Sequence, residues 1–143
     1  MSKRNDIAEN FVTVVKDTSN PQFVLVTRAP IDPALLSNAQ FPCAYIEALN
    51  EIRQNDSVNP ATRSSILTMN VHCFVKTSSE MMDIKRNEVI ERIEEALSLD
   101  QTRGGVADYT ELNEVVVEND VEQTIGKITL IFDVGYRYTT GEA

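Results

Sequence analysis

The sequence predicts an α+β domain: a mostly antiparallel sheet of four or five strands, flanked by two main helices. Two long runs, Arg63–Lys76 and Lys127–Tyr138, alternate along the chain with the period of two that is typical of strands. Apolar residues recur at helical spacing within Ser78–Leu99. The connection Asn119–Gly126 is short, so the strands on either side of it are expected to pair antiparallel. The whole chain, residues 1–143, is of the size of one domain.

The first helix is expected to start at a cap supplied by Ser2 or Asn5 and to run to about Lys16. Its apolar residues lie on one stripe, and they are Ile7, Phe11, Val14 and Val15. The turn-forming cluster Asp17–Pro21 ends it.

Two short strands are expected next, Phe23–Arg28 and Phe41–Leu49, with a loop or one helical turn between them. Pro42 cannot donate to a ladder, so it should lie at the first position of its strand or at a sheet edge. The polar stretch Glu51–Thr62 is predicted to be an exposed loop or hairpin tip.

The central strand is expected at Arg63–Lys76. One face of it carries Leu67, Met69, Val71, Cys73 and Val75. A second helix then starts at a cap supplied by Ser78 or Ser79 and runs to about Leu99. Its core-facing stripe is Ile84, Val89, Ile90, Ile93 and Leu97. Gly104 and Gly105 permit the left-handed turn that follows.

The last two strands are expected at Tyr109–Glu118 and Lys127–Tyr138. The final one is twelve residues long, whereas typical strands have five or six. Its apolar face carries Ile128, Leu130, Phe132, Val134, Tyr136 and Tyr138. Roughly the first two thirds of it are expected to pair with the preceding strand, Tyr109–Glu118, in a hairpin. The remainder, Gly135–Tyr138, is predicted to extend past its own sheet and to meet another chain.

The composition argues against several classes of function. The chain has a formal net charge of −9, so a general nucleic-acid-binding surface is disfavoured, because such a surface needs clustered Lys and Arg. No apolar run approaches the roughly 20 residues that span a bilayer, and the N-terminus lacks the apolar core of a signal peptide. We therefore expect no membrane contact and a cytoplasmic location.

Chemistry-bearing residues are few. Cys43 and Cys73 match no zinc or redox spacing and are expected to be buried free thiols. His72 is the only histidine; it is expected on an exposed or interface position, because strand neighbours point to opposite faces and it cannot pair with Cys73.

The remaining candidate motifs are also structural. The second helix carries the usual solvated face of Glu, Lys and Arg, and the acidic stretch Glu111–Glu122 lies in polar sequence rather than in a buried site that would raise a catalytic pKa. Gly104 and Gly105 follow a helix and lack the context of a nucleotide loop. No catalytic residue, metal ligand or cofactor-binding residue is therefore expected, and the chain is predicted not to be an enzyme.

Five stretches, in this order and spacing, carry a likeness to a known family. They are RNDIAENFVTVVK, FPCAYIEAL, RSSILTMNVHCFVK, EVIERIEEALSLD with its continuation QTRGGVADYTELNEVVVEND, and GKITLIFDVGYRY. This order resembles the tail terminator, or tail completion, proteins of long-tailed bacteriophages. The likeness is one of pattern and covers nearly the whole chain.

The resemblance implies a structural virion protein that forms a ring, hexameric in that family, at the head-proximal end of the tail. Such a ring caps the tail tube, ends tube polymerisation and presents a surface to the head-completion or neck proteins. The implied partners are further copies of the chain, the tail tube protein and a head-completion protein, with assembly in the host cytoplasm. No cofactor is implied. An acidic lumen would let DNA pass without specific binding.

Five residues are the candidates for the subunit or tube interface: Arg53, Arg63, Tyr136, Arg137 and Tyr138. Tyr and Arg are enriched at protein interfaces, and a ring needs two different patches that meet between neighbouring subunits. Two alternatives remain open. One is a neck or head–tail connector subunit, and the other is a small non-enzymatic regulatory domain that binds a metabolite or a protein.

Overall fold

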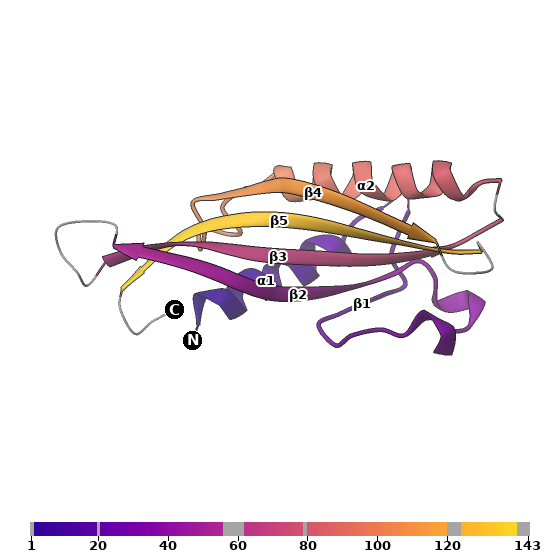
Figure 1. Cartoon of the computed structure of the whole chain (residues 1–143), viewed down its shortest axis with the longest axis horizontal. Coiled ribbons are helices and arrows are strands. Elements are labelled where there is room, and N and C mark those ends of the chain that lie inside the picture. The colour runs from indigo at the N-terminus through magenta and orange to yellow at the C-terminus, as the bar shows by residue number, and fades with distance from the viewer. Residues whose placement is uncertain (1, 20, 56–61, 79, 120–123, 140–143) are drawn as a thin grey trace.

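The computed structural model describes residues 2–19, 21–55, 62–78, 80–119 and 124–139. Five strands form one sheet in the spatial order β1-β2-β3-β5-β4 (Figure 1). Their bounds are β1 Leu25–Thr27, β2 Cys43–Asn55, β3 Thr62–Lys76, β4 Tyr109–Asn119 and β5 Ile125–Thr139. Only β1 and β2 are parallel; every other neighbouring pair is antiparallel. With two α-helices beside it, the sheet confirms the predicted α+β class.

Helix α1, Lys3–Lys16, begins where its cap was expected. The Ser2 hydroxyl accepts a hydrogen bond from the Asn5 backbone N–H at 3.2 Å, so Ser2 is the cap of the two candidates. The buried stripe is made of Ile7, Ala8, Phe11 and Val15. Phe11 meets Phe132 of β5 edge to face, with ring centroids 5.6 Å apart, which anchors the helix on the sheet.

Helix α2, Met82–Ser98, starts later than the sequence predicted. Its cap residue is Met81, which makes no side-chain capping bond, so the capping role expected of Ser78 is wrong; Ser79 lies outside the described residues. The stripe Val89, Ile93 and Leu97 is buried as expected, with Ile90 half-buried. Ile84 is exposed, and Met82 occupies the core instead, because Met82 lies about two helical turns before Val89 on the same stripe, whereas Ile84 falls on the opposite side of the helix.

The turn after α2 has three successive residues at positive φ. They are Arg103, Gly104 and Gly105, at 52°, 73° and 93°, which confirms the left-handed turn expected of the two glycines. Arg103 is 1% exposed. Its guanidinium donates to the backbone oxygens of Leu97 and Asp100 and, at 3.0 Å, to the Asn10 side chain of α1. This arginine therefore supplies hydrogen-bond donors to the backbone carbonyls at the end of α2 and links the two helices.

Strand β2 continues through residues that were predicted to be a loop. Residues 51–55 pair with β3 after a bulge between Ala48 and Glu51, so the prediction of a loop from Glu51 is wrong for this part. Residues 56–61 of that prediction lie outside the described chain. Pro42 precedes β2, in agreement with its inability to donate to a ladder, and the segment between β1 and β2 holds the short 3-10 turns η1, Pro33–Leu35, and η2, Asn38–Gln40.

Strand β5 does not extend past its sheet. It pairs with β3 from Ile125 to Thr139, although β4 accompanies it only to Gly135. The prediction that Gly135–Tyr138 is an unpaired overhang is therefore wrong. The predicted apolar face of β5 is buried throughout, Tyr136 and Tyr138 included.

Both α-helices cover the same face of the sheet. The core joins the buried side chains of α1 and α2 to those that face them from β2, β3 and β5. At one end of the long axis, β2, β3 and β5 continue past the start of α1 (Figure 1). We call this end the arm: residues 51–55 of β2, 62–67 of β3 and 135–139 of β5. The rest of the sheet, with both helices, is the body.

Candidate functional site

The arm has a buried carboxylate where the body has an apolar core. Glu51 lies on the helix-facing side of β2, opposite Leu67 of β3, and its side chain is 4% exposed. Its Oε1 accepts from the Tyr136 hydroxyl at 2.6 Å and from the Arg4 guanidinium at 3.1 Å. Its Oε2 accepts from Arg53. A carboxylate with several charge-assisted bonds is stable at low exposure.

The surroundings of Glu51 favour its charged form. Burial alone would raise the pKa of this carboxyl, but hydrogen bonds from Tyr136 and Arg53 outweigh it and hold the pKa below its ordinary value. Burial and the bond to Glu51 raise the pKa of Tyr136 to about 12. At neutral pH the cluster therefore contains an ionised carboxylate, a neutral phenol and two guanidinium groups.

Three of the five predicted interface residues meet at this cluster. Tyr136 bonds to Glu51, and Arg53 both pairs with Glu51 and lies over the ring of Tyr138, 4.9 Å from its centroid. The rings of Tyr136 and Tyr138 are buried within the chain itself, with centroids 5.8 Å apart. The two tyrosines therefore lack the exposed surface that a direct contact with another chain would use.

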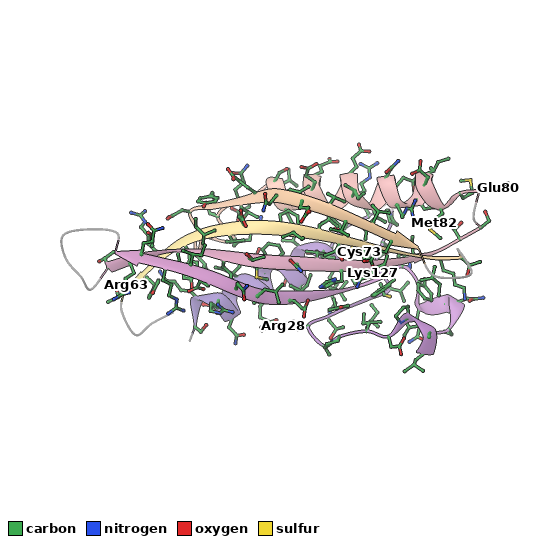
Figure 2. All side chains as sticks on the ribbon, in the orientation of Figure 1. Arg28, Arg63, Cys73, Glu80, Met82 and Lys127 are labelled. Carbon is green, nitrogen blue, oxygen red and sulfur yellow. The ribbon has the colours of Figure 1, made fainter. Side chains whose placement is uncertain are left out.

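The other two predicted residues lie on opposite faces of the arm. Arg63 is directly across from Tyr138, on the face of the cluster, and Figure 2 places it near the tip of the arm. Arg137 lies across from Ser64 on the other face, where its guanidinium pairs with Asp108 at 3.1 Å. The backbone oxygen of Arg137 accepts from the Lys3 side chain at 2.5 Å, so α1 is tied to β5 here.

The open face of the arm carries an apolar pair that the sequence did not reveal. Ile52 and Ile66 are direct partners across β2 and β3, and they are 63% and 39% exposed. Ile66 is in turn opposite Gly135, which the Tyr109 ring covers so closely that a Cβ would overlap it. Because residues 51–55 were expected to form a loop, the strand alternation that places Ile52 beside Ile66 was not recognised.

His72 is buried, so the solvent-facing position that was one of its two predicted placements is wrong, and the interface placement stays a prediction. Its Nε2 lies 2.6 Å from a Glu47 carboxylate oxygen and its Nδ1 lies 3.1 Å from the Thr129 hydroxyl. The Tyr45 ring stacks on the imidazole at 4.4 Å between centroids. Neighbouring strands and a stacked ring thus hold the imidazole in place.

Within the described part of the chain, no group of three or more His, Cys, Asp or Glu side chains is arranged to hold a metal ion. Cys43 and Cys73 are free and buried, as predicted, and burial raises the pKa of each thiol, that of Cys43 to about 11. No helix among the described residues is long and apolar enough to cross a bilayer.

The comparison with solved structures finds a similar fold. A chain from the virion of a native gene transfer agent (GTA) particle superposes with a TM-score of 0.51 at 8% sequence identity, and the match covers 94% of this chain and 94% of that one. No family model matches the sequence, and no curated protein matches it. The fold is therefore shared across nearly the full length of both chains.

Proposed function

We propose that this chain is a structural subunit of a virion, and that copies of it form a ring that caps a phage tail tube. The observation that carries the proposal is the likeness in fold to a chain of a gene transfer agent virion, which extends over 94% of both chains. A match over nearly the whole of both chains is what two subunits with the same role would give. The segment order that resembles tail terminators supports the same role.

In this role the chain works by contact and not by catalysis, and it uses no cofactor. Its partners are further copies of itself, the tail tube protein and a head-completion or neck protein, at the head-proximal end of the tail. The arginines of the arm would be attracted to acidic surfaces of its partners. The net negative charge of the chain would repel DNA that passes through the lumen of the ring. The arm is well suited to contact because it offers exposed apolar residues on one face and arginines on the other.

The test is electron microscopy of the purified chain mixed with tail-tube subunits. A terminator is expected to sit as a ring on tube ends and to shorten the tubes as its concentration rises. The variant Ile52→Asp/Ile66→Asp is the informative one for the open face of the arm, and Ile84→Asp is its control, because Ile84 is an exposed isoleucine outside the arm.

Two results would contradict this role. A chain that leaves tube length unchanged and never appears at tube ends is not a terminator. A chain that binds the head portal or neck proteins but not the tube is instead a connector subunit. Binding of a metabolite by a chain that stays monomeric would point to the regulatory alternative.

A further inference from the structure

One arginine of the arm has no acidic partner among the described residues. Arg63 makes no ion pair with any described residue, although the chain has 22 acidic residues against 13 lysines and arginines. Its Nε is buried and makes no hydrogen bond within the described chain. The side chain is half-buried near the tip of the arm, at the opposite end of the molecule from Glu80 (Figure 2).

Two glutamates on another surface are carboxylates without an ion-pair partner among the described residues. Glu94 of α2 and Glu111 of β4 line a hollow of about 350 Å³ between helix and strand. Both are exposed, and neither forms an ion pair in the described part of the chain. The rest of the lining is mixed: apolar Leu97, Leu112 and Phe132, and polar Ser98, Gln101 and Thr110. We call it the α2–β4 groove.

The chemistry of the groove fits an arginine side chain. Two carboxylates can accept the several N–H donors of a guanidinium, and the apolar side chains within the mixed lining suit the methylene groups behind it. A second copy of this chain supplies such a side chain on its arm. An arginine on one surface that meets carboxylates on a different surface is a heterologous contact, and contacts of this type form a ring when the rotation between neighbouring copies closes.

We propose that Arg63 of one copy enters the α2–β4 groove of the next copy and pairs with Glu94 and Glu111. This inference rests on the proposed ring and names the contact that builds it. Arg53 lies on the same face of the arm and already pairs with Glu51, so it holds the arm in shape while Arg63 reaches the neighbour. The Tyr138 ring, buried opposite Arg63, supports the backbone from which Arg63 projects.

A charge-swap experiment on the full chain tests this contact. The arm variant is Arg63→Glu and the groove variant is Glu94→Arg/Glu111→Arg. Each alone places like charges together and is expected to weaken self-association at least about tenfold, measured by light scattering over a concentration series. An equimolar mixture of the two is expected to regain the wild-type mass, because each arm then finds a groove of opposite charge in the other variant.

The mixture has a further diagnostic property. The two variants must alternate around the ring, so an even-numbered ring such as a hexamer closes, whereas an odd-numbered one does not. The matched control is Glu91→Arg/Glu114→Arg, which makes the same change in net charge at exposed glutamates that do not line the groove. It is expected to assemble as the wild type does. Thermal unfolding of each variant checks that it is folded.

Two outcomes overturn the contact: a mixture that stays dissociated, or a control that loses assembly as much as the groove variant. A wild-type chain that remains monomeric at every concentration also overturns it. Tube capping separates this inference from the proposed function. If the wild type caps tubes and the swaps have no effect, only the contact is wrong. If the swaps behave as expected and tubes are never capped, the contact stands and the terminator role fails.

Discussion

The body and the arm use the same strands but close their helix-facing side by different means. In the body, that side of β3 and β5 is apolar and is covered by α1 and α2. In the arm, the same side carries Glu51 with its arginine and tyrosine partners. The comparison teaches that a sheet can extend beyond its helix layer when a hydrogen-bonded charged cluster takes the place of the apolar core on that side. The extension can then serve as a contact surface.

The largest expected effect lies in the body. Phe132→Ala removes a ring that packs against Phe11 and should lower the free energy of unfolding by about 3–5 kcal/mol, because it leaves a cavity in the core. Urea denaturation at pH 7 and at pH 4 is the measurement, and the loss should be similar at both. A loss below about 1 kcal/mol would mean that apolar packing is not what holds the body together.

The next effect concerns Arg103, the one charged residue of the body that is buried among the described residues apart from the titratable His72. Arg103→Met keeps the length of the side chain but leaves the backbone oxygens of Leu97 and Asp100 without their donor. We expect the free energy of unfolding, measured by chemical denaturation, to fall by about 1–3 kcal/mol. Arg103→Lys is the matched control: it keeps the charge but lacks the planar fork, so it should recover only part of the loss. Full recovery by lysine would show that charge alone matters here.

In the arm, the corresponding change is Glu51→Gln, which should lower the free energy of unfolding by about 1–2 kcal/mol at pH 7. The effect is moderate because Arg4 and Arg53 are partly exposed, so water replaces part of their interaction with the carboxylate. The folded-state pKa of Glu51 is depressed. Its contribution is therefore present above the unfolded pKa, which is about 4.3, and is lost as pH falls through the lower folded value.

The unfolding free energies of wild type and Glu51→Gln should accordingly converge as the pH is lowered from 6 toward about 3. Glu114→Gln, at an exposed carboxylate of β4, is the control and should change the free energy of unfolding at pH 7 by no more than about 0.5 kcal/mol. Parallel pH curves for the wild type and Glu51→Gln would contradict the charged cluster as the source of arm stability.

The smallest effect on stability is expected at the open face of the arm. Ile66→Thr replaces an exposed β-branched side chain with another, so the free energy of unfolding should change by no more than about 0.5 kcal/mol. The variant's binding to tail tubes, followed by co-sedimentation, should nevertheless weaken. Stability lost without any change in tube binding would make Ile66 a folding residue and not a contact residue.

The elements that the sequence predicted well are those with a strong local period. The alternation of β3 and β5 identified their buried faces correctly, because side chains of a strand point to opposite faces in turn. The end of β2 was missed for a physical reason. Glu51 and Arg53 are polar because they take part in a cluster with Arg4 and Tyr136, residues 47 and 85 positions away from Glu51 in the sequence. No local pattern contains that partnership.

The same reason limited the prediction of the site. Tyr136, Tyr138 and Arg53 were chosen individually as interface residue types, and the structure brings all three together, but around a buried carboxylate that was assigned to a loop. The α2–β4 groove was not predicted at all. Glu94 and Glu111 look like ordinary solvated glutamates in the sequence, and only the packing of α2 beside β4 makes them neighbours of one hollow.

The central claim is that this chain carries both halves of a contact with itself, and light scattering of the full wild-type chain at rising concentration and low salt tests it most directly. The predicted result is a single assembly with about six times the 16.0 kDa mass of one chain, which dissociates as salt is added because charged groups make the contact. A mass of 16.0 kDa at every concentration and salt would contradict it.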